Sequence, residues 1–164
     1  METGLIAAIA ALVAKLIPEG WARRRNLRLS IQSEIHAVCI TMNFALMTTL
    51  IDGADDREIR RRYFPSPVRL KSVDRLLHEK QIDAIVEQLP NWQRLEWLSG
   101  ALGALTLKSD LPPAFRMIEI FGALTTPPLS RYASRETRRF ARGILSRPEV
   151  ENYRTEFYRR QAKK

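Results

Sequence analysis

The chain opens with an apolar segment, and this segment restricts the possible folds more than any other feature. Residues 4–17 include one charged side chain, that of Lys15. A helix that is apolar on nearly all sides needs either a protein core or a membrane around it. Large apolar residues recur at helical spacing and predict one continuous stripe, opposite a face of alanines. The stripe consists of Leu5, Ile6, Ile9, Leu12, Val13, Leu16 and Ile17.

The residues that follow this segment are typical of a membrane interface. Pro18 and Gly20 favour a break in the helix. Trp21 suits the headgroup region, and a basic cluster after it suits the cytoplasmic side of a membrane. The cluster consists of Arg23, Arg24 and Arg25. We therefore expect residues 1–22 to be an N-terminal anchor that places the rest of the chain on the cytoplasmic side.

The length of the apolar segment leaves several roles open. Residues Thr3 to Ile17 number 15 and would form a helix of about 22 Å, whereas the hydrocarbon core of a bilayer is about 30 Å thick. The segment could span the membrane, lie in its interface, or pack in a protein core or against a partner. A cleaved signal peptide is a further alternative, but it lacks Lys or Arg before the apolar run.

A second run, residues 35–51, contains no Asp, Glu, Lys or Arg. It could be read as another membrane span. However, basic residues lie at both of its ends, at 23–28 and 57–62, and two spans would put one of these clusters outside, against the positive-inside bias. We therefore expect a helix that starts near Asn26, runs to about Ile51 and is mostly buried in a helical bundle.

The rest of the chain predicts short helices separated by prolines and capping residues. No stretch shows the sustained alternation of a strand. The expected helix starts are Asp55 or Asp56, Ser72, Asn91, Pro112, Ser134, and Ser146 with Glu149 as a capping box. The sequence therefore predicts an all-α protein: an irregular bundle of about six or seven helices with a separate apolar N-terminal helix. Its domains are 1–22, the candidate anchor, and 23–164, a single helical domain.

Positive charge is concentrated near the C-terminus. The chain has a net charge of +9, and residues 131–164 carry 11 Lys or Arg against 4 Asp or Glu, a balance of +7. Arg131, Arg135, Arg138 and Arg142 repeat at four, three and four residues, which predicts one face of a helix. Together with the cluster at 23–25, these arginines are candidates for binding anionic lipid, an acidic partner protein, or nucleic-acid phosphate.

We find no pattern that indicates catalysis, a metal site or a cofactor. Neither His36 nor His78 lies at metal-ligand spacing from another His or Cys. Glu34 and His36 are two residues apart, so on a helix they point to different faces. Cys39 lies within an apolar run, which indicates a small buried side chain. We therefore expect a chain without enzymatic activity, metal, cofactor or small-molecule substrate.

The favoured hypothesis is a membrane-associated helical adaptor or accessory subunit that binds a membrane surface or a protein partner. One alternative is a nucleic-acid-associated protein that binds phosphate through its arginine-rich C-terminal region. A further alternative is a structural subunit of a larger assembly, in which the first helix and the small residues Gly100 and Gly103 are covered by other chains.

Overall fold

The structure is a computed structural model that describes residues 2–78, 92–106 and 110–163; for residues 2–18 and 92 it describes the backbone alone. Within these residues the chain forms seven α-helices, a 3₁₀ helix and no strand, which confirms the all-α prediction. The expected cap at Asn91 lies outside the described residues. The helices are α1 (Glu2–Asp52), α2 (Asp56–Tyr63), α3 (Lys71–His78), α5 (Trp92–Ala104), α6 (Pro113–Thr125), η2 (Leu129–Arg131), α7 (Arg135–Leu145) and α8 (Pro148–Gln161).

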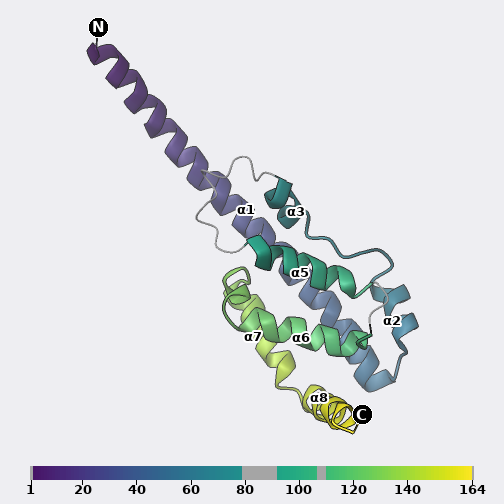
Figure 1. The fold of residues 1–164 in the computed structure, drawn as a ribbon. Helices are drawn as coiled ribbons and strands as arrows, with labels where there is room; N and C mark the ends of the chain where they lie inside the picture. The colour runs from purple at the N-terminus through teal and green to yellow at the C-terminus, as the bar shows by residue number, and fades with distance from the viewer. Residues whose placement is uncertain (1, 79–91, 107–109, 164) are drawn as a thin grey trace.

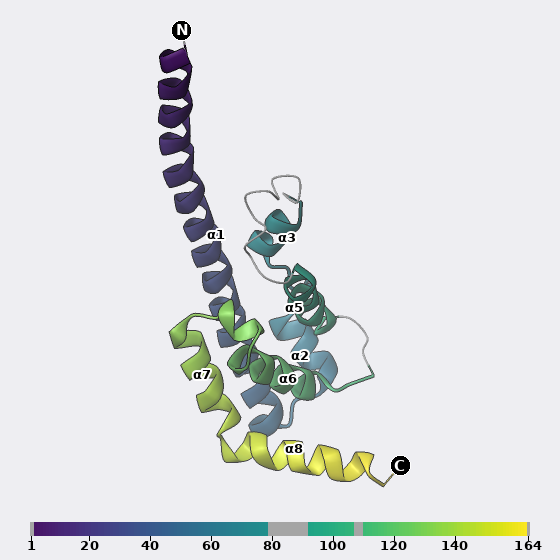
Figure 2. The same ribbon diagram turned by 60° about the vertical axis from the view of Figure 1, so that its left-hand side comes forward.

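Helix α1 is 51 residues long and runs through both the apolar segment and the bundle. Its N-terminal part extends away from all other helices, as Figures 1 and 2 show. The predicted break at Pro18 and Gly20 is wrong, and so is the predicted helix start near Asn26. Pro18 removes one backbone hydrogen bond, but alanines before it and Arg and Leu residues after it are strong helix formers. Because helix growth is cooperative, the helix continues across the proline.

The chain reverses direction after α1 in a turn at Gly53 and Ala54. Gly53 has a φ of 70°, a left-handed conformation that glycine adopts without steric cost. The Ala54 N–H donates to the Thr48 carbonyl at 3.4 Å. Asp55 then caps α2, because its carboxylate accepts the Glu58 N–H at 2.7 Å. Between α1 and α2 the hydroxyls of Thr48 and Tyr63 share a hydrogen bond of 2.8 Å.

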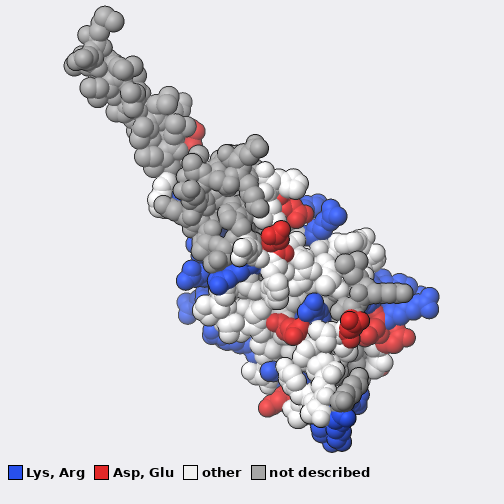
Figure 3. Space-filling model, viewed as in Figure 1, with Lys and Arg blue, Asp and Glu red and all other residues white. Residues whose placement is uncertain are grey.

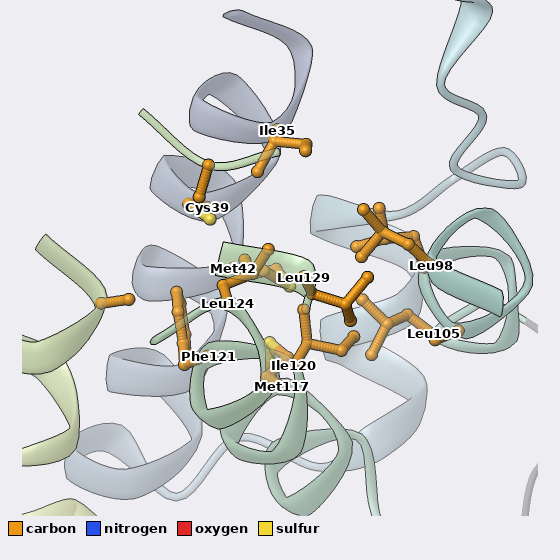
Figure 4. Close-up of a cluster of buried hydrophobic side chains, with 14 of the residues drawn as sticks. Ile35, Cys39, Met42, Leu98, Leu105, Met117, Ile120, Phe121, Leu124 and Leu129 are labelled. Carbon is orange, nitrogen blue, oxygen red and sulfur yellow. The ribbon is translucent and has the colours of Figure 1, made fainter. Parts of the chain in front are cut away.

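The core is formed by one face of α1 packed against α2, α3, α6 and α7, while α5 packs on α3 and α6. Figure 4 shows Cys39 and Met42 of α1 opposite Phe121 of α6, with Leu98 of α5 and Leu105, directly after α5, on the other side. Met42, Phe121 and Leu98 are completely buried. Each of these two helices buries an apolar stripe: Leu95, Leu98 and Leu102 in α5, with Leu105 directly after it, and Phe115, Ile118, Phe121 and Leu124 in α6.

The uncharged run of α1 is buried on one face only. Ile35, Cys39 and Leu46 lie in the core, whereas Phe44 is 59% and Ile51 64% exposed. Within the described residues one helical stretch, Glu19–Asp52, is long and apolar enough to cross a membrane. In its 18-residue apolar segment, 28% of the residues are buried in the protein. The expectation that this run is mostly buried is therefore wrong, because the remaining elements pack against one side of α1.

Glu34 of α1 fixes α3 at the edge of the bundle. Its two carboxylate oxygens accept the Ser72 N–H, each at 3.1 Å, and one of them accepts the Ser72 hydroxyl at 2.6 Å. Ser72 was expected to start this helix, but α3 begins one residue earlier and the buried Ser72 is its second residue. The carboxylate at the start of α3 therefore comes from a residue 38 positions earlier in the chain.

Candidate membrane-binding and anion-binding surface

The predicted anchor lies on the part of α1 that projects from the bundle (Figure 2). Trp21 is 68% exposed. Leu27 is the first buried side chain among those described on α1. Backbone helix is therefore available for a membrane or a partner from residue 2 to about residue 26. The stripe residues of the anchor lie where only the backbone is described: Leu5, Ile6, Ile9, Leu12, Val13, Leu16 and Ile17.

The first basic cluster lies where α1 enters the bundle. Arg23 and Arg25 are exposed. Arg24 is half-buried, and its Nε is enclosed without a hydrogen-bond partner among the described residues. Guanidinium groups at this level would lie at the headgroups of a membrane that surrounds the residues before Trp21.

The second basic segment is held against α1 by a partly buried hydrogen-bond network. Ser134 caps α7 by accepting the Thr137 N–H at 3.0 Å, as the sequence predicts. The fully buried Thr137 hydroxyl lies 2.8 Å from the Ser134 hydroxyl and 2.9 Å from His36 Nδ1 of α1. The edge of the His36 ring also meets Phe140, with ring centroids 6.1 Å apart. His36, which the sequence left without a role, therefore orients the arginine-bearing helix.

Four arginines on α7 point away from this network. Arg135, Arg138, Arg139 and Arg142 line an open hollow of about 740 Å³, together with Glu136. None of the four forms an ion pair with a carboxylate among the described residues. Arg135, at the first position of α7, opposes the helix dipole, whereas Arg142 in the last turn is favourable to it. Like charges three or four residues apart repel each other, and an external anion would relieve this repulsion.

The arginine face of α7 differs by two residues from the one that the sequence predicts. Arg131 lies in η2, before the Ser134 cap, so its placement on the face of α7 is wrong, while Arg139 joins that face. The prediction fails because the four-residue step from Arg131 to Arg135 does not lie within one continuous α-helix. Arg131 nevertheless connects the two basic segments, because its carbonyl oxygen accepts a hydrogen bond from Arg28 Nη2 at 3.4 Å.

Some of the Lys and Arg side chains line one edge of the bundle, and others lie on the right-hand side and at the bottom of the view in Figure 3. The first group lines the left-hand edge of the molecule, beside the point where α1 enters it. We call this the basic edge, and define it by residues of α1, η2 and α7. Its members are Arg23, Arg24, Arg25, Arg28, Arg131, Arg135, Arg138, Arg139 and Arg142.

A second hollow, of about 410 Å³, lies between α5, α6 and α8, and sequence reasoning missed it. Its lining includes Trp97, Phe115, Arg116 and Tyr158. Phe115 of α6 stacks on Phe157 of α8 with ring centroids 3.8 Å apart, and this contact docks α8 on the bundle. The sequence feature that could have indicated this hollow is Trp97, a large aromatic residue outside the apolar stripe of α5. Its side chain is 49% exposed.

In the described part of the molecule, no three His, Cys, Asp or Glu side chains lie close enough together to hold a metal ion. Glu34 and His36 bind on different sides of α1, to α3 and to α7, as their spacing predicts. Burial raises the pKa of the Cys39 thiol to about 12, so this thiol remains protonated and is a poor nucleophile.

The comparisons with known proteins do not identify a relative. No family model, curated protein or solved structure matches this chain.

Proposed function

We propose that this protein is a non-enzymatic, membrane-associated helical adaptor or accessory subunit. Its N-terminal helix anchors it, and the basic edge binds anionic lipid headgroups. The observation that carries the proposal is the continuity of α1 through residues 18–20 and its projection from the bundle.

Continuity matters because it lengthens the apolar helix. With a break at Pro18 the apolar helix would end at Ile17, about 22 Å from Thr3. Without the break, residues 4–21 form 18 residues of helix, about 27 Å long, close to the 30 Å or so of a hydrocarbon core. Lys15 and Glu19 lie in the second half of this stretch and can extend toward the interface.

The orientation follows from the arginines. The cluster at 23–25 comes directly after Trp21, and the positive-inside rule places it on the cytoplasmic side with the bundle. The hydrogen bond from Arg28 to the Arg131 carbonyl brings the start of the arginine-rich C-terminal region beside this cluster. Each cation near an anionic membrane surface contributes about 1 kcal/mol.

The test is flotation of the full-length protein with phosphatidylcholine vesicles, with and without phosphatidylglycerol. We expect the full chain to float with both kinds of vesicle and a variant lacking residues 1–20 to lose this association. Replacing Arg135, Arg138 and Arg142 by Gln should lower partitioning of that shortened variant into anionic vesicles by roughly 100-fold, because three such contacts are lost.

The matched control replaces three exposed arginines elsewhere, Arg57, Arg61 and Arg154, by Gln. It removes the same charge and should change partitioning much less. A full-length protein that stays in the soluble fraction without vesicles or detergent contradicts the anchor. If it also shifts duplex DNA with an affinity that falls steeply with salt, the nucleic-acid hypothesis replaces this one.

A further inference from the structure

The outward face of α1 carries an apolar seam that no element of the described structure covers. Exposed residues recur along this face at alternating steps of four and three, as in the contact line of a coiled coil. We define the α1 seam as Ser33, Ala37, Ile40, Phe44, Met47 and Ile51. Met47 is partly buried, and the other five are exposed. Leu29, 52% exposed, extends the same face toward the anchor.

The seam lies opposite the core-facing side of α1. At 100° per residue, Ile35, Cys39 and Met42 lie on one side of the helix and Ile40, Phe44 and Ile51 on the other. The attachments to α3 through Glu34 and to α7 through His36 lie on the flanks between them. The neighbouring helices therefore leave a full helix face open along residues 29–51.

The exposed apolar area is large for a monomer. With about 200 Å² for a large side chain, the exposed fractions of Leu29, Ile40, Phe44 and Ile51 amount to on the order of 400 Å² per chain. Contiguous apolar patches of this size mark interaction surfaces. Two such faces, with Ser33, Ala37, Met47 and the flanking residues, approach the 1,000 Å² or so that a specific interface needs.

The charges decide between possible occupants. Of the residues that flank the seam, Glu34 is the one Asp, Glu, Lys or Arg, and its carboxylate is bound to Ser72 of α3. The other flanking positions include His36, Thr41, Asn43 and Thr48. A helix that binds a lipid surface usually carries Lys or Arg on its flanks, and an acidic partner would need cations there. Two copies of a chain with a net charge of +9 can meet through this largely uncharged face without placing like charges against each other.

We propose that the α1 seam is a homodimer interface, in which α1 of one copy packs along α1 of a second copy. The small Ser33 and Ala37 allow close approach near the anchor, while Ile40, Phe44 and Ile51 interlock further along. The pairing does not depend on the proposed membrane function. Only the parallel direction of the two helices depends on that function, because both anchors would enter the same membrane.

The first test is the mass of the full-length protein in mild detergent, measured by sedimentation equilibrium. We expect a dimer for the native chain and for Phe44→Leu, and a shift of at least tenfold in the dimer dissociation constant for Phe44→Glu. Phe44 lies outside the core, so the helix content measured by circular dichroism should not change. Thr155→Glu, at an exposed position on α8, adds the same charge elsewhere and should leave the dimer intact.

The second test locates the contact. Ile40→Cys lies near the middle of the seam, where identical residues meet in either direction of pairing, and a short bifunctional maleimide should link it into a covalent dimer. Gln93→Cys, exposed on α5, should remain monomeric under the same treatment. A monomeric native protein, or equal linking at both positions, overturns the proposal. Vesicle binding that Phe44→Glu abolishes, with a native protein that is monomeric, also overturns it and assigns the face to lipid.

Discussion

The contact between Glu34 and Ser72 should make a large contribution to stability, and Glu34→Ala tests it. The substitution removes the acceptor of the Ser72 N–H and of the Ser72 hydroxyl. Ser72 is buried, so its two donors would have few other partners. The same carboxylate also lies at the positive end of the α3 dipole.

Two contributions set the expected magnitude. A hydrogen bond to a charged group contributes about 1.5–3 kcal/mol, and an anion at a helix N-terminus about 0.3–1 kcal/mol. Because Glu34 is half-buried, we expect Glu34→Ala to lower the free energy of unfolding by roughly 2–3 kcal/mol. For a chain of this size that corresponds to a fall in Tm of about 5–10 °C.

Urea unfolding followed by far-ultraviolet circular dichroism measures this loss. Glu34→Gln keeps one acceptor oxygen and should cost about 1 kcal/mol, so the two variants should differ clearly. Glu19→Ala, at an exposed position on the same helix, is the control and should change stability by less than about 0.5 kcal/mol. A loss below 0.5 kcal/mol for Glu34→Ala would refute the reasoning.

Three further predictions concern the interior of the bundle. Asn43→Leu should stabilise the protein by about 1 kcal/mol in urea unfolding, because the Asn43 Oδ1 is buried without a hydrogen-bond partner in the described structure; a loss of stability would contradict this. Thr137→Val should cost about 1–3 kcal/mol, since it leaves His36 and Ser134 without their shared hydroxyl, and an unchanged unfolding midpoint would argue against the network. Cys39 should resist iodoacetamide at about pH 8 until denaturant is added, since its raised pKa keeps the thiol protonated. The stability that this neutral thiol contributes should be complete below its ordinary pKa of 9.0 and decline as the pH rises through about 12.

Local features of the sequence predicted much of the fold. The caps at Asp55 and Ser134 are present because each side chain needs only a backbone N–H three residues away. The capping box at Ser146 is wrong: Arg147 holds the cap position, and the Ser146 hydroxyl bonds back to the Arg142 carbonyl. A serine hydroxyl can bond to a backbone N–H ahead of it or to a backbone carbonyl behind it, and residue spacing alone does not show which partner it takes.

Contacts between distant residues could not be predicted in the same way. Glu34 with Ser72 and His36 with Thr137 join residues 38 and 101 positions apart. Their spacing on α1 shows that Glu34 and His36 face different sides, but it does not show which helix will lie there. The same limit applies to the α1 seam, since the apolar content of residues 35–51 does not show which half of the helix the bundle covers.

The unbroken α1 joins the anchor to the bundle through one continuous helix. With no joint between the anchor and the bundle, the direction that the basic edge faces is fixed by the number of residues in the part of α1 between them. Each residue added between Trp21 and Leu27 would turn the bundle by about 100° relative to the anchor and move it about 1.5 Å further away. The number of residues in this part of α1 therefore sets two quantities: the distance of the bundle from the anchor, and the direction around the helix axis in which the arginines of the basic edge face.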